Sequence, residues 1–243
     1  MDRSCKSHIY PWFSIITGIG GFILQYWLFA GLDDGKLLPE HHLASLLSVI
    51  LLAIVFMVNL VVLRHAPRVY DYDKLFPSSL AAAIGSALSA FGFGYASLHV
   101  GGAGFLELAV PVFGILAAAS LLCIAYFRVT QRKPFCLLHC TVLAYLLLRT
   151  IARYRTWGSL SQITLYFFQL VAALLLLLAA YYRAELDIHQ KNYRKYHFFS
   201  QSALFCCFLC LVSGDQVFYL SAALWLTADY CVLPVYQGRH LEG

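Results

Sequence analysis

Residues 104–127 read GFLELAVPVFGILAAASLLCIAYF and contain a single charged residue, Glu107. About 20 helical residues are enough to cross the hydrocarbon core of a bilayer, which is about 30 Å thick. Inside that core no water is present to bond the backbone, so a spanning segment of this kind satisfies its N–H and C=O groups as a helix. This stretch therefore predicts a transmembrane helix.

Seven further apolar stretches repeat this pattern along the chain. The composition agrees, since 61% of the residues are hydrophobic, 12% are charged and the mean hydropathy is +0.73, whereas a soluble domain is about 25% charged. The connections are too short for a soluble domain, so 1–243 is predicted to be one integral-membrane domain, an all-α polytopic bundle of eight transmembrane helices. The expected spans are 11–31, 43–64, 78–98, 104–127, 135–151, 160–182, 198–212 and 216–236.

The basic residues predict the orientation of this bundle. With eight spans, thirteen of the 17 Lys and Arg residues fall on the side that holds both termini. Cytoplasmic loops carry such an excess, which places both termini in the cytoplasm of a multi-pass plasma membrane protein. If 135–151 does not span, the division falls to eleven against six. The net charge of +5 reflects this bias and does not indicate nucleic acid. The first apolar run has no cleavage signature and is expected to remain as an anchor.

Three arginines break this rule. In the predicted topology Arg149, Arg153 and Arg155 lie on the outer side, where basic residues do not favour the predicted orientation. They either anchor the protein to lipid phosphates, with Tyr154 and Trp157 at the interface, or bind an anion. Arg149 favours anion binding because it falls inside the end of the fifth span.

Polar residues recur on one face of each of the fifth and sixth spans. Arg149 and Arg153 are four residues apart, and Gln162, Tyr166 and Gln169 follow helical spacing on the next span. The short connection makes the two spans antiparallel neighbours, so these five residues are the candidate ligand-binding set. The alternative is that the polar residues only join helices through interhelical hydrogen bonds. Asp215 is expected to cap the last helix.

Cysteine and histidine offer weaker hypotheses. Cys136, His139 and Cys140 lie on one helical turn, but a zinc site normally needs a fourth ligand and nothing in the spacing supplies it. Cys207 and Cys210 form a Cys-x-x-Cys pair typical of thiol oxidoreductases. Such enzymes relay electrons to a second pair, and the outer loops contain no cysteine. We therefore expect no metal, no cofactor and no catalytic residue, and an enzymatic activity is not favoured.

Small residues indicate where helices pack closely. The third span contains small residues at intervals of four, namely Ala82, Ser86, Ala90 and Gly94, with Gly85 and Ser89 on the adjacent row. Ser14 and Gly18 follow the same spacing in the first span. A face of small side chains lets two helix backbones approach each other. These residues predict tight helix contacts.

Part of the second half of the chain resembles a family of small multi-pass bacterial membrane proteins. That family has a Tyr-Arg-x-Trp-Ser…Pro-Gln…Tyr pattern. The matching residues here are Tyr154, Arg155, Trp157, Gln162 and Tyr166. Gly158 and Ser161 stand where the family has serine and proline. The resemblance implies a bacterial plasma membrane and supplies no activity or ligand.

These patterns lead to two functional hypotheses. The first is that the protein captures or translocates a small anionic or amphipathic solute from the outer side. The second is a membrane sensor or accessory subunit, because the charged segment 183–197 is expected to extend the sixth helix into the cytoplasm or to lie on the surface. Lys191, Arg194 and Lys195 would then meet anionic lipid or a protein partner.

Overall fold

The computed structural model describes residues 9–30, 43–65, 79–100, 104–130, 132–158, 163–189, 192–212 and 214–230. Within these ranges the chain is all-α, with no strand, which confirms the all-α part of the predicted fold class. The eight α-helices are α1 (Ile9–Ala30), α2 (Leu43–His65), α4 (Leu80–Leu98), α5 (Phe105–Val129), α6 (Cys136–Gly158), α7 (Ile163–His189), α8 (Tyr193–Leu209) and α9 (Gln216–Tyr230). A short 3-10 helix, η2 (Cys210–Val212), follows α8. The last residues of the predicted eighth span, 231–236, lie outside the described ranges.

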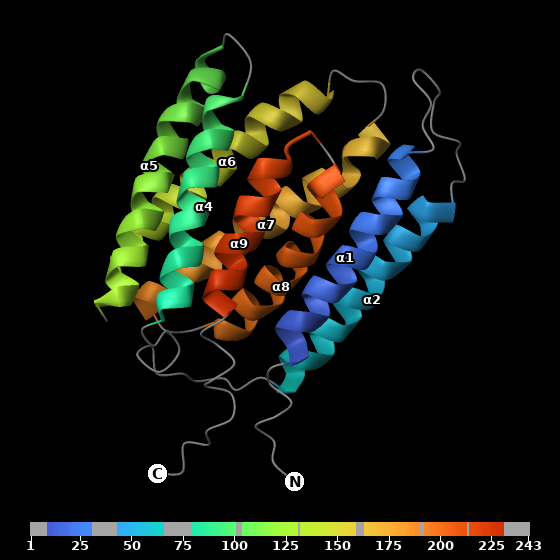
Figure 1. Cartoon of the computed structure of the whole chain (residues 1–243), viewed down its shortest axis with the longest axis horizontal. Helices are drawn as coiled ribbons and strands as arrows, with labels where there is room; N and C mark the ends of the chain where they lie inside the picture. The colour runs from blue at the N-terminus through green and yellow to red at the C-terminus, as the bar shows by residue number, and fades with distance from the viewer. Residues whose placement is uncertain are drawn as a thin grey trace.

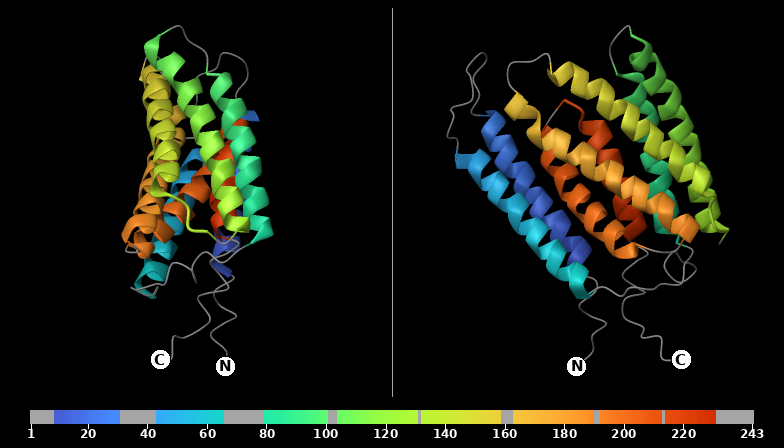
Figure 2. Two further views of the ribbon diagram at one scale, coloured as in Figure 1. Left: turned by 90° about the vertical axis from the view of Figure 1, so that its left-hand side faces the viewer. Right: turned by 180° about the vertical axis from the view of Figure 1, so that it is seen from behind.

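Successive helices run in alternating directions (Figure 1). As a result α1 begins and α9 ends at the same end of the bundle, here named the lower end, while α6 ends and α9 begins at the upper end. Helices α1 and α2 form a hairpin at one edge that packs on α8, and α4 lies between α5 and α9 (Figure 2). Helix α8 contacts α1, α2, α7 and α9, so it lies near the centre of the bundle.

Apolar side chains cover the outside of the helices. Phe91, Phe105 and Leu108 are each at least 70% exposed, whereas polar side chains such as Ser86 and Ser89 are fully buried. Among the described residues, five helical stretches are long and apolar enough to cross a membrane, and α1 and α2 contain shorter apolar stretches. The five are Leu80–Leu98, Leu108–Val129, Cys136–Arg155, Tyr166–Ile188 and Tyr193–Val212. This is the pattern of a membrane-embedded, multi-pass protein.

Several helices are longer than their hydropathy predicts. The helix predicted at 135–151 continues to Gly158, and the one predicted at 160–182 continues to His189. Helix α8 begins at Tyr193, several residues before its predicted start. At 1.5 Å per residue, α6 is about 34 Å long, enough to cross a bilayer core.

The predicted small-residue contacts are confirmed. A Cβ atom placed on Gly85 of α4 would lie 2.7 Å from the Cβ of Ala228 in α9, and one placed on Gly18 of α1 would lie 2.8 Å from the Cβ of Phe208 in α8. Real Cβ atoms do not approach so closely, so both helix pairs depend on a missing side chain. The Ser14 hydroxyl bonds Gln201 at the same α1–α8 contact.

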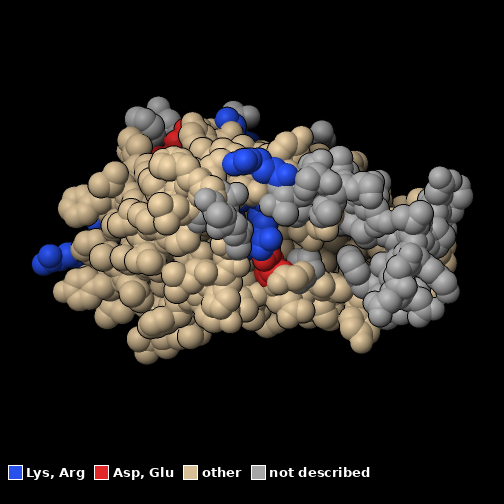
Figure 3. Space-filling view, turned by 90° about the horizontal axis from the view of Figure 1, so that it is seen from above, with Lys and Arg blue, Asp and Glu red and all other residues tan. Residues whose placement is uncertain are grey.

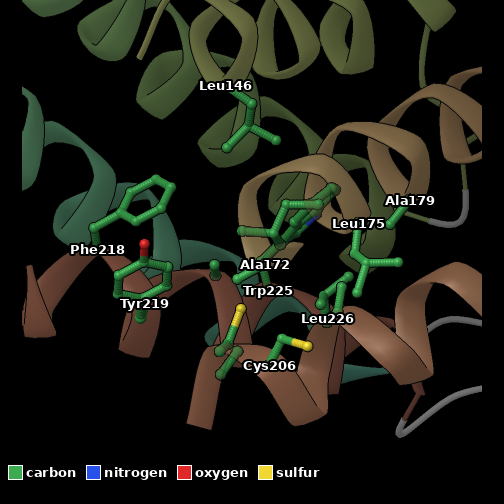
Figure 4. Close-up of a cluster of buried hydrophobic side chains, with 14 of the residues drawn as sticks. Leu146, Ala172, Leu175, Ala179, Cys206, Phe218, Tyr219, Trp225 and Leu226 are labelled. Carbon is green, nitrogen blue, oxygen red and sulfur yellow. The ribbon is translucent and has the colours of Figure 1, made fainter. Parts of the chain in front are cut away.

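The apolar core lies where α6, α7, α8 and α9 meet (Figure 4). Leu146, Ala172, Trp225 and Leu226 are buried there. Cys206 lies among them, and Cys207 and Cys210 are also buried. These cysteines pack as small apolar side chains.

Candidate functional site

Two arginines and one aspartate form a charged cluster at the upper end of the bundle. Arg149 and Arg153 lie one turn apart on α6, and Asp215 directly precedes α9. The Arg149 Nη2 atom is 3.4 Å from Asp215 Oδ2, and the Arg153 guanidinium forms an ion pair with the other carboxylate oxygen. One carboxylate therefore holds two guanidinium groups.

Arg149 is almost completely buried in this cluster, with 4% of its side chain exposed. Its Nη1 donates to the backbone carbonyl of Ala96 in α4 at 3.3 Å, and the guanidinium carbon lies 4.0 Å from the centre of the Phe218 ring. Tyr145, one turn earlier on α6, is fully buried against the same ring. The Tyr145 hydroxyl has no hydrogen-bond partner among the described residues. Arg149 thus joins α4, α6 and α9.

Arg153 is more accessible. Its side chain is 28% exposed and that of Asp215 is 17% exposed. The Arg153 Nε atom is buried and has no hydrogen-bond partner within the described part of the chain. Seen from above, basic and acidic side chains adjoin near the middle of a surface that is otherwise mostly uncharged (Figure 3). Among these three described side chains, two positive charges face one negative charge.

The structure brings together two of the five predicted site residues. Arg149 and Arg153 share Asp215, whereas Tyr166 and Gln169 lie half-buried near the start of α7. Gln162 lies outside the described residues. Asp215 does occupy the position before α9, where its backbone carbonyl accepts from the Tyr219 amide at 3.2 Å. Its carboxylate, however, binds the arginines, a role that sequence analysis missed.

A second, larger charged network lies at the lower end. The Arg183 guanidinium bridges two carboxylates, with Nη1 2.7 Å from Asp187 Oδ1 and Nε 3.1 Å from Asp229 Oδ2. Asp229 also forms an ion pair with Arg128. All four side chains are at least nine-tenths buried. Among these described side chains, two positive charges face two negative charges, and such pairing offsets the cost of burying ions.

Two further side chains complete this lower network. The His139 Nδ1 atom is 2.6 Å from Asp187 Oδ2, and the Tyr196 hydroxyl donates to Asp229 Oδ2 at 2.6 Å. The His139 Nε2 atom is buried and has no hydrogen-bond partner among the described residues. The network joins α5, α6, α7, α8 and α9 and is defined by Arg128, His139, Arg183, Asp187, Tyr196 and Asp229.

The lower network shows where the residues that follow two predicted spans lie. Arg128 and Arg183 come directly after the predicted spans 104–127 and 160–182, yet both lie in helices and are 8% and 1% exposed. The segment 183–197 does extend a helix, yet much of its polar surface faces the interior, because Asp187 and Tyr196 bind their partners there. Hydropathy alone cannot reveal these pairs, since the partners lie on other helices.

Of the three basic residues predicted to contact lipid or a partner, the structure describes two. Lys195 is exposed, with its ammonium group 5.4 Å from the centre of the Tyr182 ring, and Arg194 is half-buried. Lys191 lies outside the described residues. The surface expected to meet lipid or a partner therefore includes at least one accessible cation at the lower end.

The first turn of α6, which contains Cys136, His139 and Cys140, lies at the same lower end of the bundle. The Cys136 and Cys140 sulfur atoms lie 3.7 Å apart, and the Cys136 thiol donates to the Ala184 carbonyl. His139 is directed to Asp187. Within the described ranges no group of three or more His, Cys, Asp or Glu residues has a geometry that could hold a metal ion.

Together the fold and the two clusters define an all-helical, multi-pass type of protein with paired charges inside the bundle. No family model, curated protein or solved structure matches the chain. The function is therefore inferred from the geometry of the clusters alone.

Proposed function

We propose that this protein is an integral plasma membrane protein that captures or translocates a small anionic or amphipathic solute from the outer side. In this proposal all eight helices cross the membrane and both termini are cytoplasmic. The five long apolar helices and the excess of basic residues on one side support this arrangement. The upper end of the bundle then faces outward.

The observation that carries the proposal is the unequal charge of the upper cluster. Arg149 and Arg153 share a single carboxylate, so one guanidinium charge is not neutralised by Asp215. Charged residues within spanning helices are rare and usually mark a ligand or ion pathway. An anion that enters from water would meet the exposed side of Arg153 and complete the charge balance.

The surroundings of the cluster favour a carboxylate with an apolar part. Arginine binds carboxylates through paired N–H donors, and the Arg153 Nε is a donor that has no hydrogen-bond partner among the described residues. Phe218, Phe93 and Tyr145 pack against one another beside Arg149, so the inner wall of the cluster is aromatic. In this arrangement Arg153 binds the anion, Arg149 fixes Asp215, and Gln162, Tyr166 and Gln169 donate hydrogen bonds from α7 and its approach.

The test is a thermal-shift titration of the purified protein in detergent. Acetate and phosphate represent small anions, and hexanoate represents an amphipathic carboxylate. A ligand at 100 times its Kd stabilises the folded state by about 2.7 kcal/mol. We expect hexanoate to raise the Tm of the wild type and to have no effect on Arg153→Gln.

Arg155→Gln is the matched control. Arg155 is exposed and lies two residues from Arg153 on the same helix, so this variant loses the same charge and should keep the hexanoate shift. An equal shift in wild type and Arg153→Gln would refute the assigned site. The absence of a shift with all three anions would refute the proposed solute class.

The exposure of Lys195 supports an alternative function as a membrane sensor or accessory subunit. In that case Lys191, Arg194 and Lys195 contact an acidic partner protein at the cytoplasmic surface. Affinity purification from native membranes should then recover the partner with the wild type and lose it when the three residues are replaced by glutamine. A preparation without any second protein would count against this function.

A further inference from the structure

We propose that His139 and Asp187 form a proton-binding site that is linked to the upper cluster through α6 and α9. The proton-binding site is inferred from the geometry of the lower network alone. Its link to a solute rests on the function proposed above.

The first argument is the arrangement of the His139 ring. Nδ1 and Asp187 Oδ2 lie 2.6 Å apart, a close contact whose angles do not make it a hydrogen bond. We assign the proton of the neutral ring to Nδ1, beside the carboxylate. Nε2 then carries a lone pair, is buried, and has no hydrogen-bond donor among the described residues. A proton taken up by His139 goes to Nε2 and turns the ring into an imidazolium beside Asp187.

The second argument is the charge balance of the network. Among the described residues, the charges of Arg128 and Arg183 are matched by those of Asp187 and Asp229. Of the six side chains in the network, His139 is the one that can gain a positive charge while these four residues keep theirs. Chains of His and Asp inside membrane proteins commonly serve as proton relays.

The charged groups around His139 determine how protonation of its ring would change the contacts of the lower network. Arg183 binds Asp187 from α7, and Arg128 lies on α5. An imidazolium would give Asp187 a second cation and compete with the Arg183 Nη1 bond. Arg183 would then shift toward Asp229, its second carboxylate. The remaining titratable neighbours are Cys136 and Cys140 on α6 and Tyr196 on α8.

Two shared helices, α6 and α9, connect the two charged clusters at opposite ends of the bundle. Helix α6 carries His139 near its start and Arg149 and Arg153 further along, while α9 has Asp215 before its start and Asp229 near its end. Both charged clusters therefore join the same two helices. A change in the Arg183–Asp229 contact moves the lower end of α9, and the upper end of α9 is held by the arginines that bind the solute.

The proton site is tested by NMR of ligand-free protein with ¹⁵N-labelled histidine in lipid nanodiscs. The His139 signal is assigned by its loss in His139→Gln. From pH 8 to pH 5 we expect this ring to change from the neutral to the doubly protonated form. In Asp187→Asn the imidazolium signal should weaken at every pH, because its counter-charge is gone.

His197→Gln is the control for histidine burial. His197 is also buried, on α8, where its ring packs edge-on against Tyr193, so its removal should leave the His139 titration unchanged. A His139 ring that stays neutral to pH 5, or that titrates identically in Asp187→Asn, would refute the proton site.

The link is tested separately with hexanoate. We expect the thermal shift to differ between pH 5 and pH 8 in the wild type and to be the same at both pH values in His139→Gln. A pH dependence that persists in His139→Gln would refute the link while leaving solute binding intact. If hexanoate binds neither variant, the proposed function and the link fail together, and the NMR titration still decides the proton site.

Discussion

Arg183 of α7 and Asp229 of α9 form a buried ion pair across 46 positions of sequence, with Nε 3.1 Å from Oδ2 and both side chains at most 1% exposed. An isolated charge in such surroundings is very unfavourable, so the pair exists because each residue compensates the other. The same carboxylate also binds Arg128 and Tyr196. Asp229 is thus the residue on which most of the lower network converges.

Replacement of Asp229 by asparagine should therefore destabilise the protein strongly. The variant keeps the size of the side chain but leaves Arg128 and Arg183 without their shared counter-charge. Loss of one member of a buried ion pair costs about 3–5 kcal/mol. Thermal unfolding in detergent should show a large fall in Tm.

Glu185→Gln provides the comparison for this variant. Glu185 lies on α7 near the same end, is half-buried, and accepts one hydrogen bond from Asn192 at 2.6 Å. Removal of its charge should cost less than about 1 kcal/mol. Equal losses of Tm in the two variants would show that the buried network does not contribute the stability expected of it.

Two glycines of α1 should respond in opposite ways to alanine. In Gly18→Ala the new methyl group meets Phe208 Cβ at 2.8 Å, so α1 and α8 must separate. Overpacking of this kind costs about 1–3 kcal/mol. At Gly20 no described atom outside the adjoining backbone of α1 lies within 4 Å of the added methyl group, and alanine favours the helix over glycine by up to about 1 kcal/mol. Tm should fall for Gly18→Ala and stay level or rise for Gly20→Ala; the reverse order would contradict the α1–α8 packing.

The sequence predicted the eight helices because each apolar stretch is long enough to be recognised on its own. It did not predict the pairing of charges, because the partners of Arg183 and Arg149 lie on helices that are distant in sequence. The predicted ends of the helices at 135–151 and 160–182 were too early, because hydropathy does not reveal such charge pairs. Charged residues such as Asp187 indicate a loop by hydropathy, yet they continue the helix where a partner neutralises them. Asp215 was recognised as a helix start, while its contact with Arg153 needed the fold.

Replacement of Asp215 by asparagine should destabilise the ligand-free protein and strengthen its binding of an anion. The carboxylate of Asp215 holds Arg149 and Arg153, so its loss removes an ion pair between α6 and α9 and lowers the Tm without ligand. The same loss leaves both guanidinium groups free to bind an external carboxylate. The hexanoate shift should therefore be larger than in the wild type. A smaller shift would mean that Asp215 helps to form the site instead of competing with the ligand.

The orientation of the bundle can be tested with two exposed positions at opposite ends. Tyr154 lies on α6 beyond the upper cluster and is 59% exposed, and Lys195 is exposed near the start of α8 at the lower end. In intact cells a membrane-impermeant maleimide should label Tyr154→Cys above the wild-type background and should label Lys195→Cys only after the membrane is permeabilised.

This difference follows from the predicted eight-span topology, which assigns thirteen of the basic residues to the side of the termini and four to the opposite side. The reversed labelling pattern would place the upper cluster in the cytoplasm, and the solute would then be captured from inside the cell. Labelling of both positions in intact cells would instead show that α7, which connects the two ends, does not cross the membrane. Either result bears directly on the proposed function, because access to Arg153 determines from which compartment an anion can arrive.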